Sequence, residues 1–218
     1  MSEVNASKES VRAHYLSVLE KFDFFSLIEK SARLSDQFSN WIRDHHHLLQ
    51  GKTVLSYVPF GNEPQLNIEM ESRNEPYQVG YVRVYDWKAC LMEAHFARRD
   101  MPDMWEELTF KNGNKVFQPM ISQALCGPEA VGAILIPGLS FTKEGTRLGR
   151  GAGFYDRFLI RYPQALRVGI AFEEQIANSL PSNSWDIPID ALLTDTAFYP
   201  MKSYGEWQKN GKLRLSKE

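Results

Sequence analysis

Hydrophobic positions in the first fifty residues recur at helical spacing. From about Ser7 to Phe22, apolar residues lie three or four positions apart, which places them on one face of a helix. A second helical pattern runs from about Ser26 to Leu48 and stops before Gly51, a residue type that often ends helices. The sequence therefore predicts two amphipathic helices ahead of any strand.

Short and nearly continuous apolar runs follow these helices. Such runs suit buried strands better than helices when turn-forming residues bound them. They cover residues 53–60, 78–85, 133–138, 167–172 and 190–196. Because helical patterns separate several of the runs, the alternation predicts an α/β fold with a mostly parallel central sheet flanked by helices.

Length and composition favour one globular domain over residues 1–218. The 218 residues are 43% hydrophobic and 24% charged, as in ordinary folded proteins. We divide the chain into N-terminal helices (1–50), an α/β core (51–201) and a polar C-terminal tail (202–218), whose start we expect to be a surface strand or tail. Residues 97–128 show no sustained period, and we interpret them as a connecting excursion.

Charge and cysteine content narrow the classes of partner and compartment. A net charge of −2 gives little long-range attraction for nucleic acid. No stretch approaches 18 continuous apolar residues, and the first residues lack the apolar core of a signal peptide, so we expect no membrane association. Without a secretory context, Cys90 and Cys126 should be reduced, as in the cytoplasm. A monomer and a homodimer are both compatible with the sequence.

The segment from residue 137 to residue 163 combines glycines with basic side chains. Gly149, Gly151 and Gly153 alternate, so the backbone can adopt positive φ and expose N–H groups to phosphate oxygens. A helix predicted to begin near Phe154 would add the positive end of its dipole. The segment has neither a P-loop nor a G-x-G-x-x-G spacing. On composition alone, a glycine-rich hairpin without a ligand is equally consistent with it.

Charge is unevenly distributed along this part of the chain. Residues 143–167 hold six Lys or Arg against two acids, whereas residues 168–196 hold five acids and no Lys or Arg. A basic loop could hold polyphosphate while Asp156 and Asp186 meet at the strand ends and hold Mg²⁺. Each aspartate is equally consistent with a helix-start or turn residue.

These residues resemble the 5-formyltetrahydrofolate cyclo-ligases, also called methenyltetrahydrofolate synthetases. The family hallmark is Pro-Gly-x-x-Phe followed by Gly-x-Arg-Leu-Gly-x-Gly-x-Gly-Tyr-Tyr-Asp-Arg, and the chain has PGLSF at 137–141 and GTRLGRGAGFYDR at 145–157. The block at 170–195 also resembles the family, as do Lys8 with Arg12 and the segment 57–63. The resemblance is strong over 133–196 and poor over 86–128. Ala152 replaces a frequent Lys or Gly, and Phe154 replaces the first Tyr.

The resemblance implies an ATP-dependent, Mg²⁺-requiring ligase that converts 5-formyltetrahydrofolate to 5,10-methenyltetrahydrofolate. ATP would phosphorylate the formyl oxygen, a neighbouring folate nitrogen would close the ring by forming a C–N bond, and phosphate would leave together with ADP as the second product. This chemistry requires alignment and charge screening rather than a nucleophilic side chain.

The resemblance also implies roles for individual residues. Those expected around ATP are Lys8, Arg12, Arg147, Gly149, Arg150, Gly151, Gly153 and Tyr155. Those expected to contact the folate are Val58, Glu63, Arg150, Gly151 and Phe154. Asp156 and Asp186 are expected to hold Mg²⁺. Arg147 and Arg150 are the expected catalytic residues, with Arg150 as a buried cation directed at developing charge.

Other interpretations stay open from the sequence. Without the resemblance, Glu63 is typical of an exposed loop acid, and Lys8 with Arg12 is typical of a solvated helix face. The chain could be a non-catalytic relative that binds folate, nucleotide or RNA, or a sugar-phosphate isomerase that binds one phosphate without ATP. Retention of both aspartates with two arginines favours the enzyme, because binding alone would not require metal ligands.

Overall fold

The computed structural model describes residues 7–68, 77–109 and 115–210. Its helices are α1 (Lys8–Glu20), α2 (Phe24–Leu49), α4 (Phe154–Leu159) and α5 (Lys202–Asn210). The strands of the main sheet are β1 (Thr53–Ser56), β2 (Gln78–Asp86), β3 (Leu91–Phe96), β6 (Val131–Pro137), β9 (Leu166–Ala171), β10 (Ala191–Thr194) and β11 (Phe198–Pro200).

Two hairpins and three short 3₁₀ turns complete the described elements. The first hairpin pairs β4 (Trp105–Thr109) with β5 (Lys115–Pro119), and the second pairs β7 (Ser140–Phe141) with β8 (Arg147–Leu148). The 3₁₀ turns are η1 (Pro102–Met104), η2 (Pro128–Ala130) and η3 (Glu173–Gln175).

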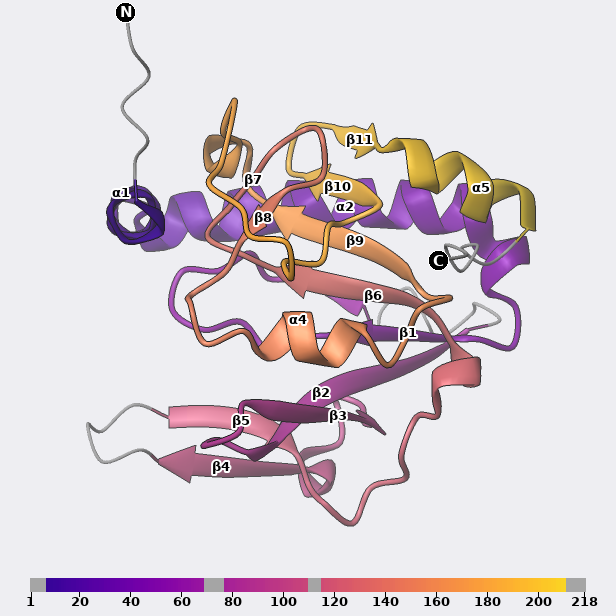
Figure 1. Cartoon of the computed structure of the whole chain (residues 1–218). Coiled ribbons are helices and arrows are strands. Elements are labelled where there is room, and N and C mark those ends of the chain that lie inside the picture. Colours follow the sequence, from indigo (N-terminus) through magenta and orange to yellow (C-terminus); the bar gives the residue numbers. More distant parts are fainter. Residues whose placement is uncertain (1–6, 69–76, 110–114, 211–218) are drawn as a thin grey trace, which may run out of the picture.

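The main sheet has the strand order β11-β10-β9-β6-β1-β2-β3 (Figure 1). Strands β10, β9, β6, β1 and β2 run parallel to one another, and the edge strands β11 and β3 run antiparallel to their neighbours. The prediction of an α/β fold with a mostly parallel sheet and two N-terminal helices is therefore confirmed.

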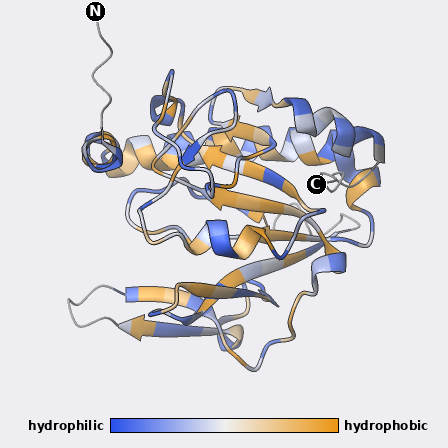
Figure 2. Cartoon of the chain, viewed as in Figure 1, coloured by the Kyte–Doolittle hydropathy of each residue, from blue (hydrophilic) through white to orange (hydrophobic). Residues whose placement is uncertain are grey.

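Each face of the sheet buries its own apolar core. In β6, Ala133 and Leu135 pack in the core that contains α2 and α5, whereas Ile134 and Ile136 pack with α4 on the other face. Figure 1 shows α2 and α4 on opposite sides of the sheet, and Figure 2 shows hydrophobic residues along the inner strands. Strands buried on both faces are nearly continuous apolar runs, which explains why the sequence revealed them.

The first strand is shorter than the sequence predicted. β1 ends at Ser56 rather than at residue 60, and the chain then passes through Pro59 to Gly61, whose φ of 63° favours glycine. Because the strand ends early, residues 57–63 form a loop at the edge of the sheet.

The expectation of a surface strand or tail is wrong for residues 202–210, which form α5, and residues 211–218 of the predicted tail lie outside the described residues. Tyr204 and Trp207 are buried against α2. The indole nitrogen of Trp41 donates to the Tyr204 hydroxyl at 3.0 Å, and that hydroxyl lies 2.7 Å from Nε2 of His45. Two apolar contacts in a polar segment were too few to predict this helix.

The interpretation of residues 97–128 as a connecting excursion is also wrong in part. Strands β4 and β5 form an antiparallel hairpin that packs beside β2. The Gln118 side chain accepts from the Val84 backbone N–H at 3.2 Å and donates to Glu106 at 2.9 Å, and Glu106 pairs with Arg83. Hydrogen bonds and an ion pair between polar side chains therefore hold the hairpin against the sheet. A hydrophobic pattern in the sequence does not reveal such contacts.

The helices do not reach the requirements of a membrane span. Within the described ranges, none of them is both long enough and apolar enough to cross a bilayer.

We expect the change Trp207→Ala to reduce the free energy of unfolding by about 3–5 kcal/mol, because it leaves a large cavity between α5 and α2. Urea denaturation measures this change. Lys209→Ala on the exposed side of α5 is the control and should alter stability by less than about 0.5 kcal/mol. A loss below about 1 kcal/mol for Trp207→Ala would show that α5 is not part of the core.

Candidate functional site

The carboxyl ends of β1 and β6 border a cleft of about 700 Å³. The two strands are parallel neighbours, but β1 is followed in the sheet by β2 on one side, whereas β6 is followed by β9 on the other. Parallel sheets bind ligands at such reversals of strand order, because the loops leave the two strands in opposite directions. Residues 57–63 and 138–153 therefore lie on either side of this cleft.

The structure brings all of the residues singled out in the sequence to this cleft. They come from α1, from the loop after β1, from β8 and the glycine segment after it, from α4 and from the segment before β10. The lining includes Lys8, Arg12, Val58, Glu63, Arg147, Gly149, Arg150, Gly151, Gly153, Phe154, Tyr155, Asp156 and Asp186.

The glycine segment follows β8 and leads into α4. Gly151 has φ of 107°, and Gly153, the residue before the first turn of α4, has φ of 71°; L side chains rarely adopt such values. The Arg12 side chain lies over the segment and donates through Nε to the Gly149 carbonyl at 3.1 Å. A Cβ atom on Gly151 would lie 3.2 Å from Cζ of Arg12. Backbone conformation thus requires glycine at positions 151 and 153, whereas Gly149 does not have a positive φ.

Helix α1 contributes two cations to the cleft. Lys8 and Arg12 lie one turn apart and are both half-buried, and Lys8 pairs with Asp186. At the other end of α1, Asn62 donates to the Leu19 carbonyl at 2.9 Å. These contacts rule out the solvated helix face as the location of the two cations.

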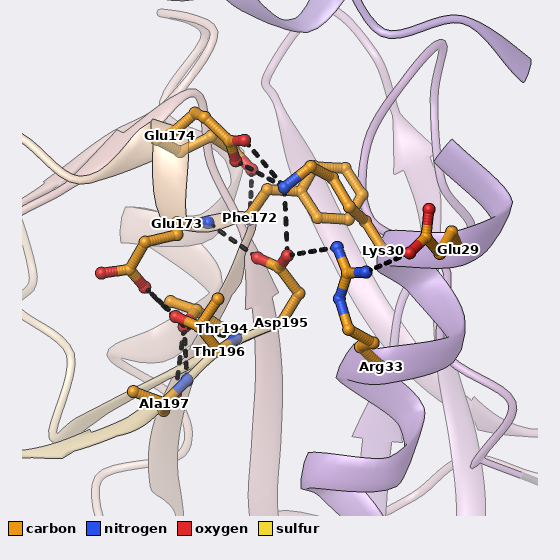
Figure 3. Close-up of polar contacts among 11 residues, drawn as sticks. Glu29, Lys30, Arg33, Phe172, Glu173, Glu174, Thr194, Asp195, Thr196 and Ala197 are labelled. Atoms are coloured by element: carbon orange, nitrogen blue, oxygen red, sulfur yellow. Dashed lines mark hydrogen bonds and ion pairs between the residues drawn. The ribbon is translucent and has the colours of Figure 1, made fainter. Parts of the chain in front are cut away.

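A buried carboxylate, Asp195, binds two cations near the start of α2 (Figure 3). The Asp195 side chain is fully buried, and it accepts from Lys30 Nζ at 3.1 Å and from the Glu173 backbone N–H at 2.9 Å. Lys30 Nζ also lies 5.5 Å from the ring centroid of Phe22, which lies in the connection between the two helices. The network therefore helps to hold α1 beside the cleft.

Two aspartates meet on the side of the cleft nearest α1. Oδ1 of Asp156 accepts from Arg147 Nη2 and from the Ile187 backbone N–H, each at 3.1 Å. This places Asp156 beside Asp186, the residue before Ile187. Burial acts to raise the pKa of Asp186, but the hydrogen bonds from Lys8 and the Asn183 backbone N–H, together with the charges of Lys8 and Arg147, outweigh it, so that the pKa lies below its usual value. Asp186 is therefore an anionic partner of Lys8 at neutral pH.

The donor chemistry of these aspartates fits Mg²⁺. No cluster of three or more His, Cys, Asp or Glu side chains with a metal-binding arrangement occurs among the described residues. Mg²⁺ is commonly held by one or two carboxylates together with substrate phosphates and water. Asp156 and Asp186 could supply those carboxylates but would not complete a metal site by themselves.

Glu63 and Arg150 form an ion pair at the opposite side of the cleft. Glu63 is only 5% exposed, so it is not a solvated loop acid. It accepts from Arg150 Nε at 2.9 Å and from the Phe60 backbone N–H at 3.0 Å. Burial raises the pKa of Glu63, although both donors oppose the rise.

Arg150 is less buried than the sequence suggested. Its side chain is 39% exposed, which corrects the expectation of a buried cation. The guanidinium donates to the Phe60 carbonyl at 3.1 Å and lies 5.0 Å from the centroid of that ring. Arg150 is exposed because it lies at the open rim of the glycine segment. The buried arginine is Arg147, whose side chain is 6% exposed.

An apolar wall that the hydrophobic pattern did not predict faces Glu63. It consists of side chains from β2, β3, β5 and α4, and from the turn between β2 and β3. Phe154 contacts this wall, with its ring centroid 5.7 Å from that of Trp87. The wall residues are Val82, Val84, Trp87, Met92, Val116, Phe117 and Ile160. The dipeptide Asn112-Gly113 between two apolar-containing runs is a hairpin signal that could have indicated part of this wall.

Comparisons with known proteins agree on one family. A model of the 5-formyltetrahydrofolate cyclo-ligase family matches residues 4–195. A 5-formyltetrahydrofolate cyclo-ligase from Mus musculus is 43% identical over 200 residues, which are 87% of this chain and 94% of the relative.

Solved structures show the same fold. The 5,10-methenyltetrahydrofolate synthetase of Aquifex aeolicus has a TM-score of 0.71 at 26% identity, covering 89% of this chain and 93% of its own. The 5,10-methenyltetrahydrofolate synthetase of Mycoplasma pneumoniae has a TM-score of 0.69 at 18% identity, covering 87% and 99%.

We expect Gly151→Ala to lower the free energy of unfolding by about 1 kcal/mol or more, because alanine is strained at this φ and its Cβ crowds Arg12. Gly127→Ala is the matched control, since Gly127 has φ of −67° and open space around its Cα. Chemical denaturation of both variants measures the difference. Equal stabilities would contradict the backbone requirement at residue 151.

Proposed function

The chain belongs to the 5-formyltetrahydrofolate cyclo-ligase family, whose ATP-dependent enzymes convert 5-formyltetrahydrofolate to 5,10-methenyltetrahydrofolate, and we propose that this conversion takes place in the cleft at the ends of β1 and β6. The observation that supports this location is the convergence of cations, two adjacent aspartates and a buried glutamate from segments far apart in sequence. These groups have the charges that a triphosphate, a divalent cation and a pterin ring require.

The ATP phosphates would lie at the α1 side of the cleft. Glycine N–H groups at 149–153 would approach the phosphate oxygens without interference from Cβ atoms. Lys8, Arg12 and Arg147 would neutralise the phosphate charge, and Tyr155, whose ring lies 5.5 Å from the Arg147 guanidinium, would support that arginine. The phosphates would thus pair with the cations Lys8 and Arg147, which pair with Asp186 and Asp156 when no ATP is bound.

The same exchange explains a requirement for a divalent ion. When Lys8 and Arg147 pair with phosphate, their half-buried carboxylate partners lose the positive charge that compensated them. This loss costs free energy. Asp156 and Asp186 would then hold Mg²⁺. Bound there, Mg²⁺ would screen the charge on the transferring phosphoryl group.

The folate would lie against the opposite wall. Glu63 would accept hydrogen bonds from the donor-rich pterin ring, and Val58 and Phe154 would pack against its faces. Arg150 and Gly151 lie between this wall and the phosphate side, so both could contact either ligand. The arrangement would bring the formyl oxygen towards the γ-phosphate.

The chain's own residues would act mainly by alignment and electrostatics. The formyl oxygen attacks the γ-phosphorus as the bond to ADP breaks. The neighbouring folate nitrogen then bonds to the formyl carbon and gives up its proton, and the C–O bond breaks to release phosphate. Arg147 and Arg150 would stabilise the negative charge on the transferring group and on the departing phosphate. The apolar wall would exclude water from the phosphorylated intermediate.

The cellular setting and assembly are also part of this proposal. We place the protein in the cytoplasm, where Cys90 and Cys126, both free thiols, would remain reduced. Its partners would be the two small-molecule substrates, and the protein would act as a monomer or homodimer. Cell fractionation and size-exclusion chromatography with light scattering test the compartment and the assembly.

The reaction itself is tested by mixing the protein with 5-formyltetrahydrofolate, ATP and Mg²⁺. We expect methenyl absorbance to rise together with an equal amount of ADP, and we expect neither product when ATP is omitted. If absorbance and ADP both stay at the background level, the proposed function is wrong.

We expect Asp156→Asn to reduce kcat by about 100-fold or more, because an amide cannot replace the carboxylate charge toward a divalent cation. Steady-state turnover at varied Mg²⁺ concentration measures the effect, and thermal denaturation checks the fold. Asp103→Asn, at an exposed position, is the control. Unchanged turnover would exclude Asp156 as a metal ligand.

We expect Arg150→Ala to reduce kcat by about 100-fold, far more than any accompanying loss of stability explains, because a cation directed at developing charge contributes mainly in the transition state. Arg43→Ala, on the exposed side of α2, is the matched control and should leave kcat unchanged. A decrease of less than about threefold for Arg150→Ala would contradict a catalytic role.

A further inference from the structure

A second and smaller cavity adjoins the folate side of the cleft. Its volume is about 300 Å³. Val58 and Phe117 line both this cavity and the main cleft, so the two spaces meet along these side chains. The remaining lining residues are Arg99, Pro102 and Trp105. Among the described residues that line it, Arg99 carries the only charge.

The loop that carries Arg99 is fixed to the body of the protein. The Trp105 indole nitrogen donates to the Arg98 carbonyl at 2.7 Å, and the Trp105 ring meets Tyr81 edge-on at 5.0 Å between centroids. The Met101 backbone N–H also donates to the Arg98 carbonyl, at 3.1 Å. The backbone beside Arg99 is thus held in place by contacts with its neighbours, and its cation can be part of a formed site.

Two adjacent arginines in this loop have different surroundings. Arg98 donates through two nitrogens to the Asp100 carboxylate, at 2.9 and 2.7 Å, and it lines neither cavity. Arg99, in contrast, lines the smaller cavity. Of the two arginines, Arg99 is therefore the one that borders the space beside the cleft.

A reduced folate has three parts in a fixed order: a pterin ring, an aromatic aminobenzoyl group and a glutamyl end with carboxylates. With the pterin at Glu63, the aromatic group would pass between Val58 and Phe117 into the smaller cavity. The carboxylates at the end of the molecule would then need a cation. Lys8 and Arg147 of the main cleft are assigned above to the phosphates, and Arg150 lies between the phosphates and the pterin, whereas Arg99 lines the smaller cavity itself.

We propose that the smaller cavity is the subsite for the glutamyl end of the folate and that Arg99 determines specificity there by pairing with its carboxylates. Arginine suits this role because its planar guanidinium can donate two parallel hydrogen bonds to one carboxylate. This inference depends on the proposed function, because it takes the pterin to lie at Glu63. It adds a binding residue from a segment without a family motif.

The test compares two substrates that differ only at the proposed contact. These are 5-formyltetrahydrofolate and 5-formyltetrahydropteroate, which lacks the glutamate. We expect wild-type protein to show a KM about tenfold lower for the folate, a ratio typical of one charge-assisted pair. Arg99→Ala should abolish this ratio by raising only the folate KM, without changing kcat or the KM for ATP. Arg98→Ala should retain the wild-type ratio.

The pteroate also controls for damage to the fold, because a misfolded variant would handle both substrates badly. If Arg99→Ala keeps the wild-type ratio, or if Arg98→Ala loses it equally, the subsite is wrong while the proposed function stands. If wild-type protein converts neither substrate, the proposed function is wrong. Equilibrium titration of the same two ligands without ATP then decides the subsite, through the ratio of their Kd values in wild type and Arg99→Ala.

Discussion

The parallel pairing of β1 with β6 is the constraint on which the candidate site depends. Leu55 of β1 lies opposite Ile134 of β6, so the two strands point to the same edge of the sheet. The loops that follow leave in opposite directions and border one crevice. Glu63 and Arg150 are 87 positions apart in sequence, but Arg150 Nε lies 2.9 Å from Glu63 Oε1 across this crevice. Without this pairing, the glycine segment would have no acidic or apolar wall opposite it.

The charges in the cleft are organised as pairs. Lys8 with Asp186, Arg147 with Asp156, and Arg150 with Glu63 each join a cation to an acid at least partly removed from water. A ligand that binds one member of such a pair leaves the charge of the other member uncompensated. A ligand that brings only anionic phosphate would therefore bind less well than one that brings phosphate with a divalent cation. This favours ATP with Mg²⁺ over the single sugar phosphate of an isomerase, and it also favours an enzyme over a simple binding module.

The sequence predicted those features that have a local pattern. The doubly buried strands are continuous apolar runs, and the glycine segment has an ordered motif, so both could be found. Helix α5 could not, because its burial depends on Trp41 and His45 of α2, which are distant in the chain. The β4–β5 hairpin attaches through Gln118 and Glu106, which a hydrophobic pattern ignores. The burial of Glu63 and the exposure of Arg150 also depend on the tertiary pairing of two loops.

A crystal structure of the protein with a non-hydrolysable ATP analogue, Mg²⁺ and 5-formyltetrahydrofolate would test most directly that one cleft holds both substrates. The expected result is that the triphosphate lies on residues 149–153 with Mg²⁺ at Asp156 and Asp186, and that the pterin contacts Glu63 with its formyl oxygen facing the γ-phosphate. Nucleotide bound elsewhere on the protein, or a pterin remote from Glu63, would contradict the account.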